Sequence, residues 1–181
     1  MAEVYDRRRS QDEKKQIEII KEVIREISRE NKENISTDLE DFDDISNGNG
    51  YGGQYINENG HMTSSLRIKR NHFYDAKALD GVVYYESKKT KDRIDVYFVC
   101  KYTEGTGGIQ DDIPMEIGRT IENFKKNRDN KVGIFFLEGP YWKPSIIEEG
   151  RFDNEKTFHA TRENLKEILV GVLKSNNILN V

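Results

Sequence analysis

The sequence predicts an α/β fold in which a mixed β-sheet is flanked by helices. Isoleucines recur at three- and four-residue spacing near the amino terminus, which is typical of an amphipathic helix. Two runs rich in β-branched and aromatic residues, 81–85 and 94–100, are typical of strands. A further helical pattern precedes the apolar run 132–137, and another follows it. This alternation favours one sheet with helices packed against it.

The amino-terminal part of the chain is predicted to be helical from about Ser10 to Asn34, and we interpret residues 1–34 as a helical segment. Its buried stripe is expected to comprise Ile17, Ile20, Ile24 and Ile27. An acidic stretch follows at 38–44. Residues 47–60 are interpreted as a flexible glycine-rich loop, because Gly and Asn tolerate positive φ and bury little area. The loop lacks the Gly-Lys-Ser/Thr ending of a phosphate-binding P-loop, which excludes that function.

The middle of the chain contains the strand signals. Residues 66–70 alternate between apolar and basic side chains, which predicts a strand. The charged segment 87–93 predicts a hairpin turn between the runs 81–85 and 94–100. A helix is predicted from about Ile113 to Asn127, with Pro114 in its first turn. Its buried stripe is expected to comprise Ile113, Ile117, Ile121 and Phe124.

The carboxyl-terminal part is predicted to contain a strand and a helix. The continuous apolar run 132–137 is typical of a strand that is buried on both faces. Thr161 is expected to cap the last helix. The inward face of that helix is expected to comprise Leu165, Ile168, Leu169 and Val172.

Length and composition restrict the function classes. A chain of 181 residues is expected to form a single domain over 1–181, and its one cysteine, Cys100, excludes an internal disulfide framework and a multi-cysteine zinc site. No apolar run approaches the roughly 20 residues of a membrane span, and the first residues lack the apolar stretch of a signal peptide. We therefore expect a soluble, cytoplasmic protein with no membrane partner. The 29 Lys and Arg and 33 Asp and Glu give a net charge of −4, which offers no support for nucleic-acid binding.

Three residues have the types that phosphodiester hydrolysis needs. Asp80 precedes the first apolar strand, Lys101 ends the second, and Glu116 lies in the first part of the following helix. Hard cations such as Mg²⁺ prefer carboxylate oxygens, and an ammonium group offsets the negative charge that develops on phosphate. A hairpin brings the start of one strand next to the end of its partner, so Asp80 and Lys101 are expected to converge at one sheet edge.

With these residues in this order, the segment resembles the PD-(D/E)XK nuclease superfamily, in particular restriction enzymes of the EcoRI-like kind. The resemblance covers about the middle third of the chain. It includes Asp-Gly-Val-Val from Asp80, the charged hairpin, the strand ending in Lys101, the helix with Glu116, and the strand 135–139. The resemblance implies a restriction-endonuclease-like fold and a catalytic site formed by Asp80, Lys101 and Glu116.

Two positions depart from the pattern of the superfamily. Leu79 stands where the proline is usual, and Val99 stands where a second acidic residue is expected. The segment is similar to the NgoMIV-type enzymes, in which the glutamate comes from the following helix. The resemblance therefore implies Asp80 and Glu116 as Mg²⁺ ligands and Lys101 as the residue that positions water and stabilises charge.

Each of these residues also has an ordinary structural interpretation. Asp80 before a glycine is typical of a turn, Lys101 of the polar end of a strand, and Glu116 of a helix start, where it complements the dipole. The segment 86–88 also matches Glu-x-Lys, but Lys88 lies in the polar hairpin and is interpreted as a surface residue.

The remaining expectations concern DNA. Arg and Asn read guanine and adenine edges, so Arg119 and Asn123 are candidate base contacts, with Gln110 in the approach loop. Lys69 and Arg70 are candidate phosphate contacts. Solvated surface residues are the alternative interpretation for all of them.

The resemblance implies a type II restriction endonuclease that cuts double-stranded DNA at a short specific sequence, with Mg²⁺ as cofactor and a homodimer as the assembly. One alternative is a superfamily nuclease of DNA repair or phage defence with little sequence specificity. Another is a catalytically inactive DNA-binding protein on the same scaffold, if Val99 marks a lost site.

Overall fold

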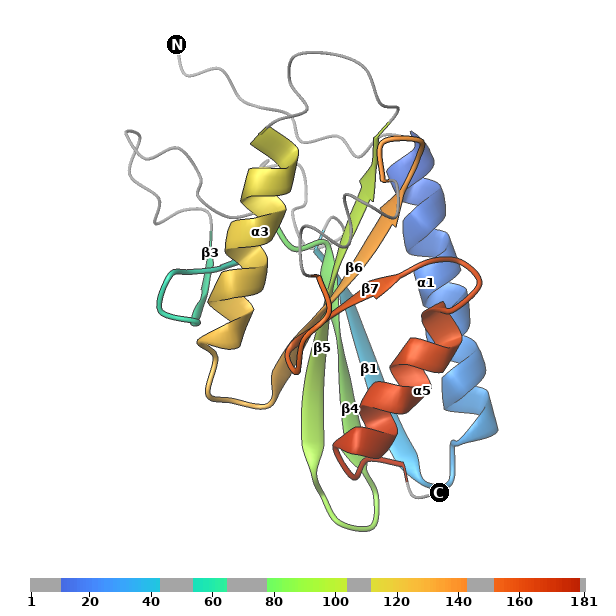
Figure 1. Ribbon diagram of the computed structural model, residues 1–181. Helices are drawn as coiled ribbons and strands as arrows, with labels where there is room; N and C mark the ends of the chain where they lie inside the picture. Colours follow the sequence, from blue (N-terminus) through green and yellow to red (C-terminus); the bar gives the residue numbers. More distant parts are fainter. Residues whose placement is uncertain (1–10, 43–53, 65–77, 104–111, 143–151, 180–181) are drawn as a thin grey trace.

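A computed structural model describes residues 11–42, 54–64, 78–103, 112–142 and 152–179 (Figure 1). A five-stranded mixed sheet has the order β1-β4-β5-β6-β7, and a two-stranded sheet, β2-β3, lies beside α3. The strands are β1 (Ile35–Asp41), β2 (Gln54–Ile56), β3 (Met62–Ser64), β4 (Gly81–Ser87), β5 (Arg93–Tyr102), β6 (Lys131–Glu138) and β7 (Thr157–Ala160). The helices are α1 (Gln11–Glu30), α3 (Asp112–Lys125) and α5 (Leu165–Ser175). The predicted α/β class is confirmed, and the arrangement is consistent with a restriction-endonuclease-like fold.

The pairing of the strands changes direction at the centre of the sheet. β1, β4 and β5 pair antiparallel, whereas β5, β6 and β7 pair parallel. A parallel pair cannot be closed by a tight turn, so the chain crosses from β5 to β6 through α3. The hairpin predicted between β4 and β5 is confirmed, with the turn around 88–92.

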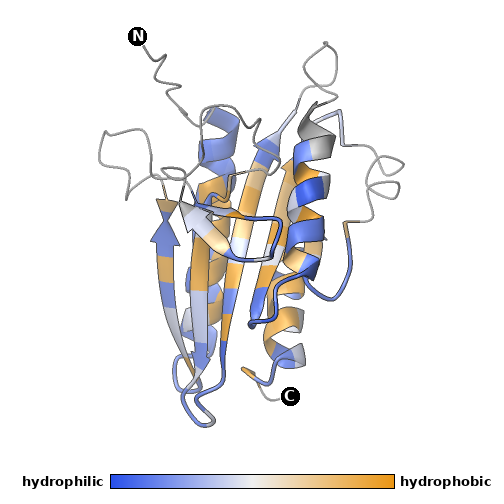
Figure 2. Cartoon of the chain, turned by 90° about the vertical axis from the view of Figure 1, so that its left-hand side faces the viewer, coloured by the Kyte–Doolittle hydropathy of each residue, from blue (hydrophilic) through white to orange (hydrophobic). Residues whose placement is uncertain are grey.

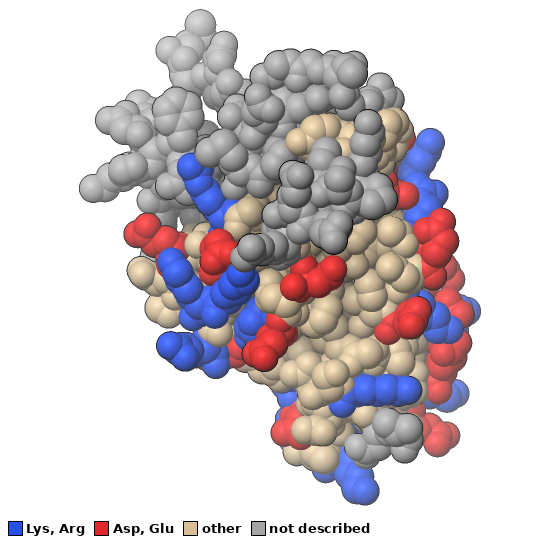
Figure 3. Space-filling model, in the orientation of Figure 1, with Lys and Arg blue, Asp and Glu red and all other residues tan. Residues whose placement is uncertain are grey.

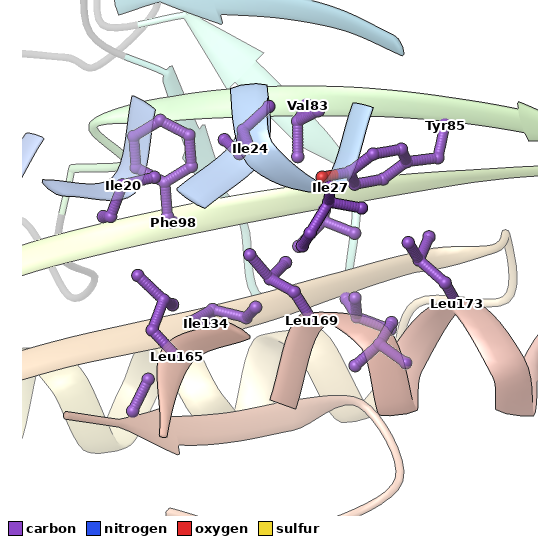
Figure 4. Close-up of a cluster of buried hydrophobic side chains, with 14 of the residues drawn as sticks. Ile20, Ile24, Ile27, Val83, Tyr85, Phe98, Ile134, Leu165, Leu169 and Leu173 are labelled. Atoms are coloured by element: carbon purple, nitrogen blue, oxygen red, sulfur yellow. The ribbon is translucent and has the colours of Figure 1, made fainter. Parts of the chain in front are cut away.

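Helices cover both faces of the sheet. α1 and α5 lie side by side on one face and α3 lies on the other (Figure 1). Figure 4 shows the first interface, where isoleucines of α1 and leucines of α5 meet Val83, Phe98 and Ile134 of the strands. The four isoleucines predicted for the inner face of α1 are each at most 3% exposed. Among the described helices, none is long and apolar enough to cross a membrane.

The second core lies between the sheet and α3. Ile117, Ile121 and Phe124 of the helix pack against alternate residues of β5 and β6, including Val99 and Phe135. Because β6 contributes to both cores, its residues Val132 to Leu137 are almost all apolar and buried, as predicted. Figure 2 accordingly shows hydrophobic residues along the middle of the sheet, whereas the turns at one end are hydrophilic.

Four strands were absent from the prediction. β1 and β7 lie at the two edges of the large sheet, and β2 and β3 form the small one. β1 occupies most of the stretch interpreted only as acidic, and its charged residues are tolerated because an edge strand is covered on fewer sides. Residues 54–60, expected to be part of a flexible loop, instead form β2, with Tyr55 and Ile56 buried, and a turn.

The start of the last helix also differs from the prediction. The residue that precedes α5 is Asn164, and Thr161 lies one turn earlier. The Asn164 side chain accepts a hydrogen bond from the Thr161 N–H at 2.6 Å, and the Thr161 carbonyl accepts one from Leu165. Thr161 therefore belongs to the turn before the helix and does not cap it. The strand predicted at 66–70 lies outside the described residues.

Candidate functional site

Asp80 and Lys101 lie at the same end of the large sheet. Asp80 immediately precedes β4, and Lys101 is the second-last residue of the antiparallel β5. The turn that joins the two strands is at the opposite end (Figure 1). The hairpin thus brings Asp80 and Lys101 to one end of the sheet, as predicted. The starts of α1 and α3 lie at the same end.

Asp80 is held by hydrogen bonds on both sides. Its N–H donates to the Phe98 carbonyl at 2.8 Å, and its own carbonyl accepts from Phe42 at 3.1 Å. Its Oδ2 accepts a hydrogen bond from the Cys100 N–H at 2.7 Å. The carboxylate is therefore fixed against β5 at the residue that precedes Lys101.

Lys101 contacts α1, which the sequence did not indicate. Its Nζ lies 3.6 Å from Glu13 Oε1, and the two side chains are 22% and 15% exposed. Its carbonyl accepts a hydrogen bond from Gln16 Nε2 at 3.2 Å. Glu13 and Gln16 are one helical turn apart on the side that carries Ile17 and Ile20. Polar residues on the buried side of an amphipathic helix were the one signal that could have identified them.

Glu116 is half-buried in α3. Its backbone carbonyl accepts a hydrogen bond from the Thr120 hydroxyl at 2.9 Å. Within the described part of the chain, the carboxylate that forms an ion pair with Lys101 belongs to Glu13 and not to Glu116. The described residues also contain no group of three or more His, Cys, Asp and Glu that could hold a metal ion.

Val99 occupies the position at which the superfamily places an acidic residue. Its side chain is fully buried in the core with Ile117 and Ile121. The position thus contributes to packing between the sheet and α3 and supplies no carboxylate.

The candidate DNA contacts are placed differently from one another. Arg119 is exposed on α3. Asn123 is only 8% exposed, and its amide donates to the Ile56 carbonyl at 3.0 Å, so this side chain is buried against β2, contrary to the expected base contact. Gln110, Lys69 and Arg70 lie outside the described residues.

Two other locations can be compared with this site. Lys88 is exposed at the far end of the hairpin and donates to the Lys32 carbonyl, which agrees with its interpretation as a surface residue. A shallow hollow of about 420 Å³ lies on the sheet face toward the same end. It is lined by Ser36, Thr37, Asp38, Glu40, Tyr84, Glu86 and Arg93. Three carboxylates in its wall would repel phosphate.

Tyr84 in this hollow is held by neighbours of both charges. Its hydroxyl donates to Glu40 at 3.3 Å, and Arg93 stacks over its ring at 4.5 Å from the centroid. Burial, reinforced by nearby acidic groups, raises the pKa of Tyr84 to about 12. The phenol therefore remains neutral at physiological pH.

Positive and negative side chains are interspersed on the face shown in Figure 3, in the part of the surface that the structure describes. The exposed cations Lys125, Lys126 and Arg128 lie at the end of α3 that is remote from Glu116. A helix rises about 1.5 Å per residue, so these cations are more than one helical turn away from the candidate site. The charge distribution by itself does not assign a DNA-binding surface.

Comparison with protein-family models, with curated proteins and with solved structures gave no match for the chain. The functional assignment therefore depends on the geometry described above.

Proposed function

We propose that the protein is a Mg²⁺-dependent endodeoxyribonuclease that hydrolyses double-stranded DNA at a short specific sequence, as type II restriction enzymes do. The observation that carries this proposal is the placement of Asp80 against the end of β5. The hydrogen bond from Cys100 fixes its carboxylate beside the strand residue that precedes Lys101. A carboxylate that can bind a divalent cation and an ammonium group that offsets negative charge, both at one sheet end, suit the hydrolysis of a phosphodiester.

The donor chemistry fits Mg²⁺. The ion is commonly bound by one or two carboxylates and keeps several waters, so the absence of a three-ligand group among the described residues does not conflict with it. Asp80 and Glu116 would hold the ion, which supplies an activated water and polarises the phosphate. Lys101 would orient the attacking water and offset the charge that develops on the phosphate oxygens.

The alternative of a nuclease with little sequence specificity is favoured by one observation. Two residues of α3 were expected to contact bases. Asn123 is hydrogen-bonded to the Ile56 carbonyl, so Arg119 is the one of the two that is exposed, and few side chains are left to read the sequence. The alternative of an inactive DNA-binding protein is favoured by Val99, whose complete burial shows that this position serves the core. The experiment below separates all three.

Supercoiled plasmid is incubated with the protein and Mg²⁺, and the products are resolved by electrophoresis. We expect discrete fragments, and a loss of at least about 100-fold in cleavage rate for Asp80→Ala, because the site loses a charged metal ligand. Asp80→Asn tests the same loss of charge while retaining an oxygen that accepts the hydrogen bond from Cys100. Asp92→Asn, in the exposed β4–β5 turn, is the matched control and is expected to cleave normally.

Random degradation that depends on Asp80 would favour the nonspecific nuclease. Binding of duplex DNA without cleavage in Mg²⁺ or Mn²⁺ would favour the inactive DNA-binding protein. If the protein neither binds nor cleaves DNA, the proposal and both alternatives are wrong.

A further inference from the structure

We propose that Glu13 and Gln16 of α1 are positioning residues for Lys101, with Glu13 holding its ammonium and Gln16 its backbone carbonyl. This inference rests on the proposed nuclease function, in which Lys101 acts at the scissile phosphate. It gives α1, which lies on the face of the sheet opposite α3, a defined role in the same site.

Gln16 connects α1 by hydrogen bonds to β5 and β6, near the carboxyl ends of both strands. Its Nε2 donates to the carbonyls of Lys101 in β5 and Phe136 in β6, both at 3.2 Å. The residue is fully buried, and its Oε1 is without a hydrogen-bond partner among the described residues. An unpaired buried acceptor costs about 1–3 kcal/mol, which an apolar residue would avoid. The hydrogen bonds to these two carbonyls therefore explain why a glutamine, and not an apolar residue, occupies position 16.

Glu13 acts on the other end of the same lysine. Its side chain and that of Lys101 are both largely shielded from water, unlike the ion pair of Glu26 with Lys166, whose side chains are 42% and 39% exposed. Shielding strengthens the attraction between opposite charges. The 3.6 Å separation is longer than a direct charged hydrogen bond of about 2.8 Å, so the carboxylate attracts the ammonium by charge without a direct hydrogen bond.

Restraint of both ends matters because lysine has a flexible four-carbon stem. The side chain carries about 2 kcal/mol of rotamer entropy, which is lost when the ammonium must sit beside a reacting phosphate. Gln16 fixes the strand end from which the stem projects, and Glu13 limits where the ammonium lies. The expected consequence is a faster chemical step and not tighter DNA binding.

The test replaces Glu13 by glutamine and measures two quantities. Cleavage of plasmid at saturating protein and Mg²⁺ is expected to slow by about 10- to 100-fold, because the ammonium is no longer held in place. Affinity for a fluorescein-labelled duplex, measured by anisotropy in EDTA, is expected to be unchanged or higher, because a negative charge is removed. Glu18→Gln is the matched control on the same helix, since its side chain is 67% exposed, and both quantities should equal those of the wild type.

A double variant separates positioning from general damage to the fold. If Glu13 acts through Lys101, adding Glu13→Gln to Lys101→Ala causes no further loss of rate. A further loss in the double variant, or a rate loss explained by a lower fraction of folded protein at the assay temperature, would overturn the inference. Normal cleavage by Glu13→Gln would overturn it while the nuclease function stands. Failure of the wild type to cleave removes the proposed function and, with it, this inference.

Discussion

At the scale of single residues, two positions define the candidate site. Asp80 has a carboxylate fixed by a hydrogen bond, and position 99 has a valine where the sequence resemblance leads us to expect a carboxylate. Asp80 is fixed against β5 by the Cys100 N–H, whereas Val99 is enclosed by the core under α3. A glutamate at position 99 would have to bury its charge among Ile117 and Phe124, at a cost that a metal would need to offset. Packing between the sheet and α3 thus accounts for an apolar residue at position 99, and in the proposed site Glu116 would supply the second carboxylate.

Gly81, next to Asp80, allows a close approach of three strands. A Cβ at this position would lie 2.3 Å from a ring carbon of Phe98 and 2.7 Å from the Glu40 carbonyl oxygen. We predict that Gly81→Ala lowers the free energy of unfolding by about 1–3 kcal/mol, since the ring and the backbone must both shift. Urea denaturation measures the change.

Gly171 provides the control for this substitution. It lies in α5, and a Cβ there would meet no atom within 4 Å apart from its chain neighbours and the backbone of its own helix. Gly171→Ala is therefore expected to raise the free energy of unfolding by about 0.5–1 kcal/mol through its helix propensity. Equal effects of the two alanines would show that the crowding at Gly81 does not exist.

At the scale of elements, α3 joins the small sheet to the large one. Asn123 of α3 donates to the Ile56 carbonyl at 3.0 Å, and Asn127, two residues after the helix ends, donates to the Gly60 carbonyl at 2.8 Å. These amides satisfy backbone carbonyls of the β2–β3 hairpin that are otherwise removed from water. The helix that was expected to contact DNA therefore uses one of its polar side chains, Asn123, to bind this hairpin.

We predict that Asn123→Ala lowers the free energy of unfolding by about 1–3 kcal/mol, because the buried Ile56 carbonyl loses its donor. The fragment pattern of the remaining folded protein should be unchanged, since the side chain is buried. Glu122→Ala, at a neighbouring residue whose side chain is 63% exposed, should stay within about 0.5 kcal/mol of the wild type. A changed fragment pattern with undiminished stability would instead assign Asn123 to base recognition.

At the scale of the whole molecule, a central sheet separates two cores, and both faces are needed to stabilise it. The candidate site lies at the end where β5 meets the starts of α1 and α3, so elements from both faces reach it. Global stability and the geometry of the site are therefore linked through the same strands.

The pH dependence of global stability is expected to depend on His159 in β7. Burial lowers the pKa of His159 below its ordinary value of 6.5, and its ring lies 6.3 Å from that of Phe152. The unfolded chain then binds a proton more readily than the folded one below that pH. The free energy of unfolding should therefore fall as the pH decreases from 7 toward 5.

We predict a shallower fall over this range for His159→Phe, which retains an aromatic ring and removes the titrating group. Thermal or urea unfolding at a series of pH values provides the measurement. The slope of the free energy of unfolding against pH is compared between the two proteins, and not the free energy of unfolding at pH 8. Identical slopes for the wild type and the variant would contradict the prediction.

The elements predicted correctly are those whose signal is local. The isoleucine spacing of α1, the β-branched run of β5, the stripe of α3 and the apolar run of β6 each reflect burial along one segment. The strands β1, β2, β3 and β7 were not predicted. A short strand at a sheet edge, or in a two-stranded sheet, needs little apolar pattern of its own and forms only when a neighbour supplies hydrogen bonds.

The sequence by itself determined the α/β class, the hairpin that places Asp80 beside the end of β5, and the absence of an acidic residue at Val99. Only the tertiary structure decided which side chains surround Lys101, because Glu13 and Gln16 come from a helix far away in the chain. It also decided that Asn123 faces inward. Periodicity reports which face of a segment is buried, whereas the partners of that face depend on how distant segments pack.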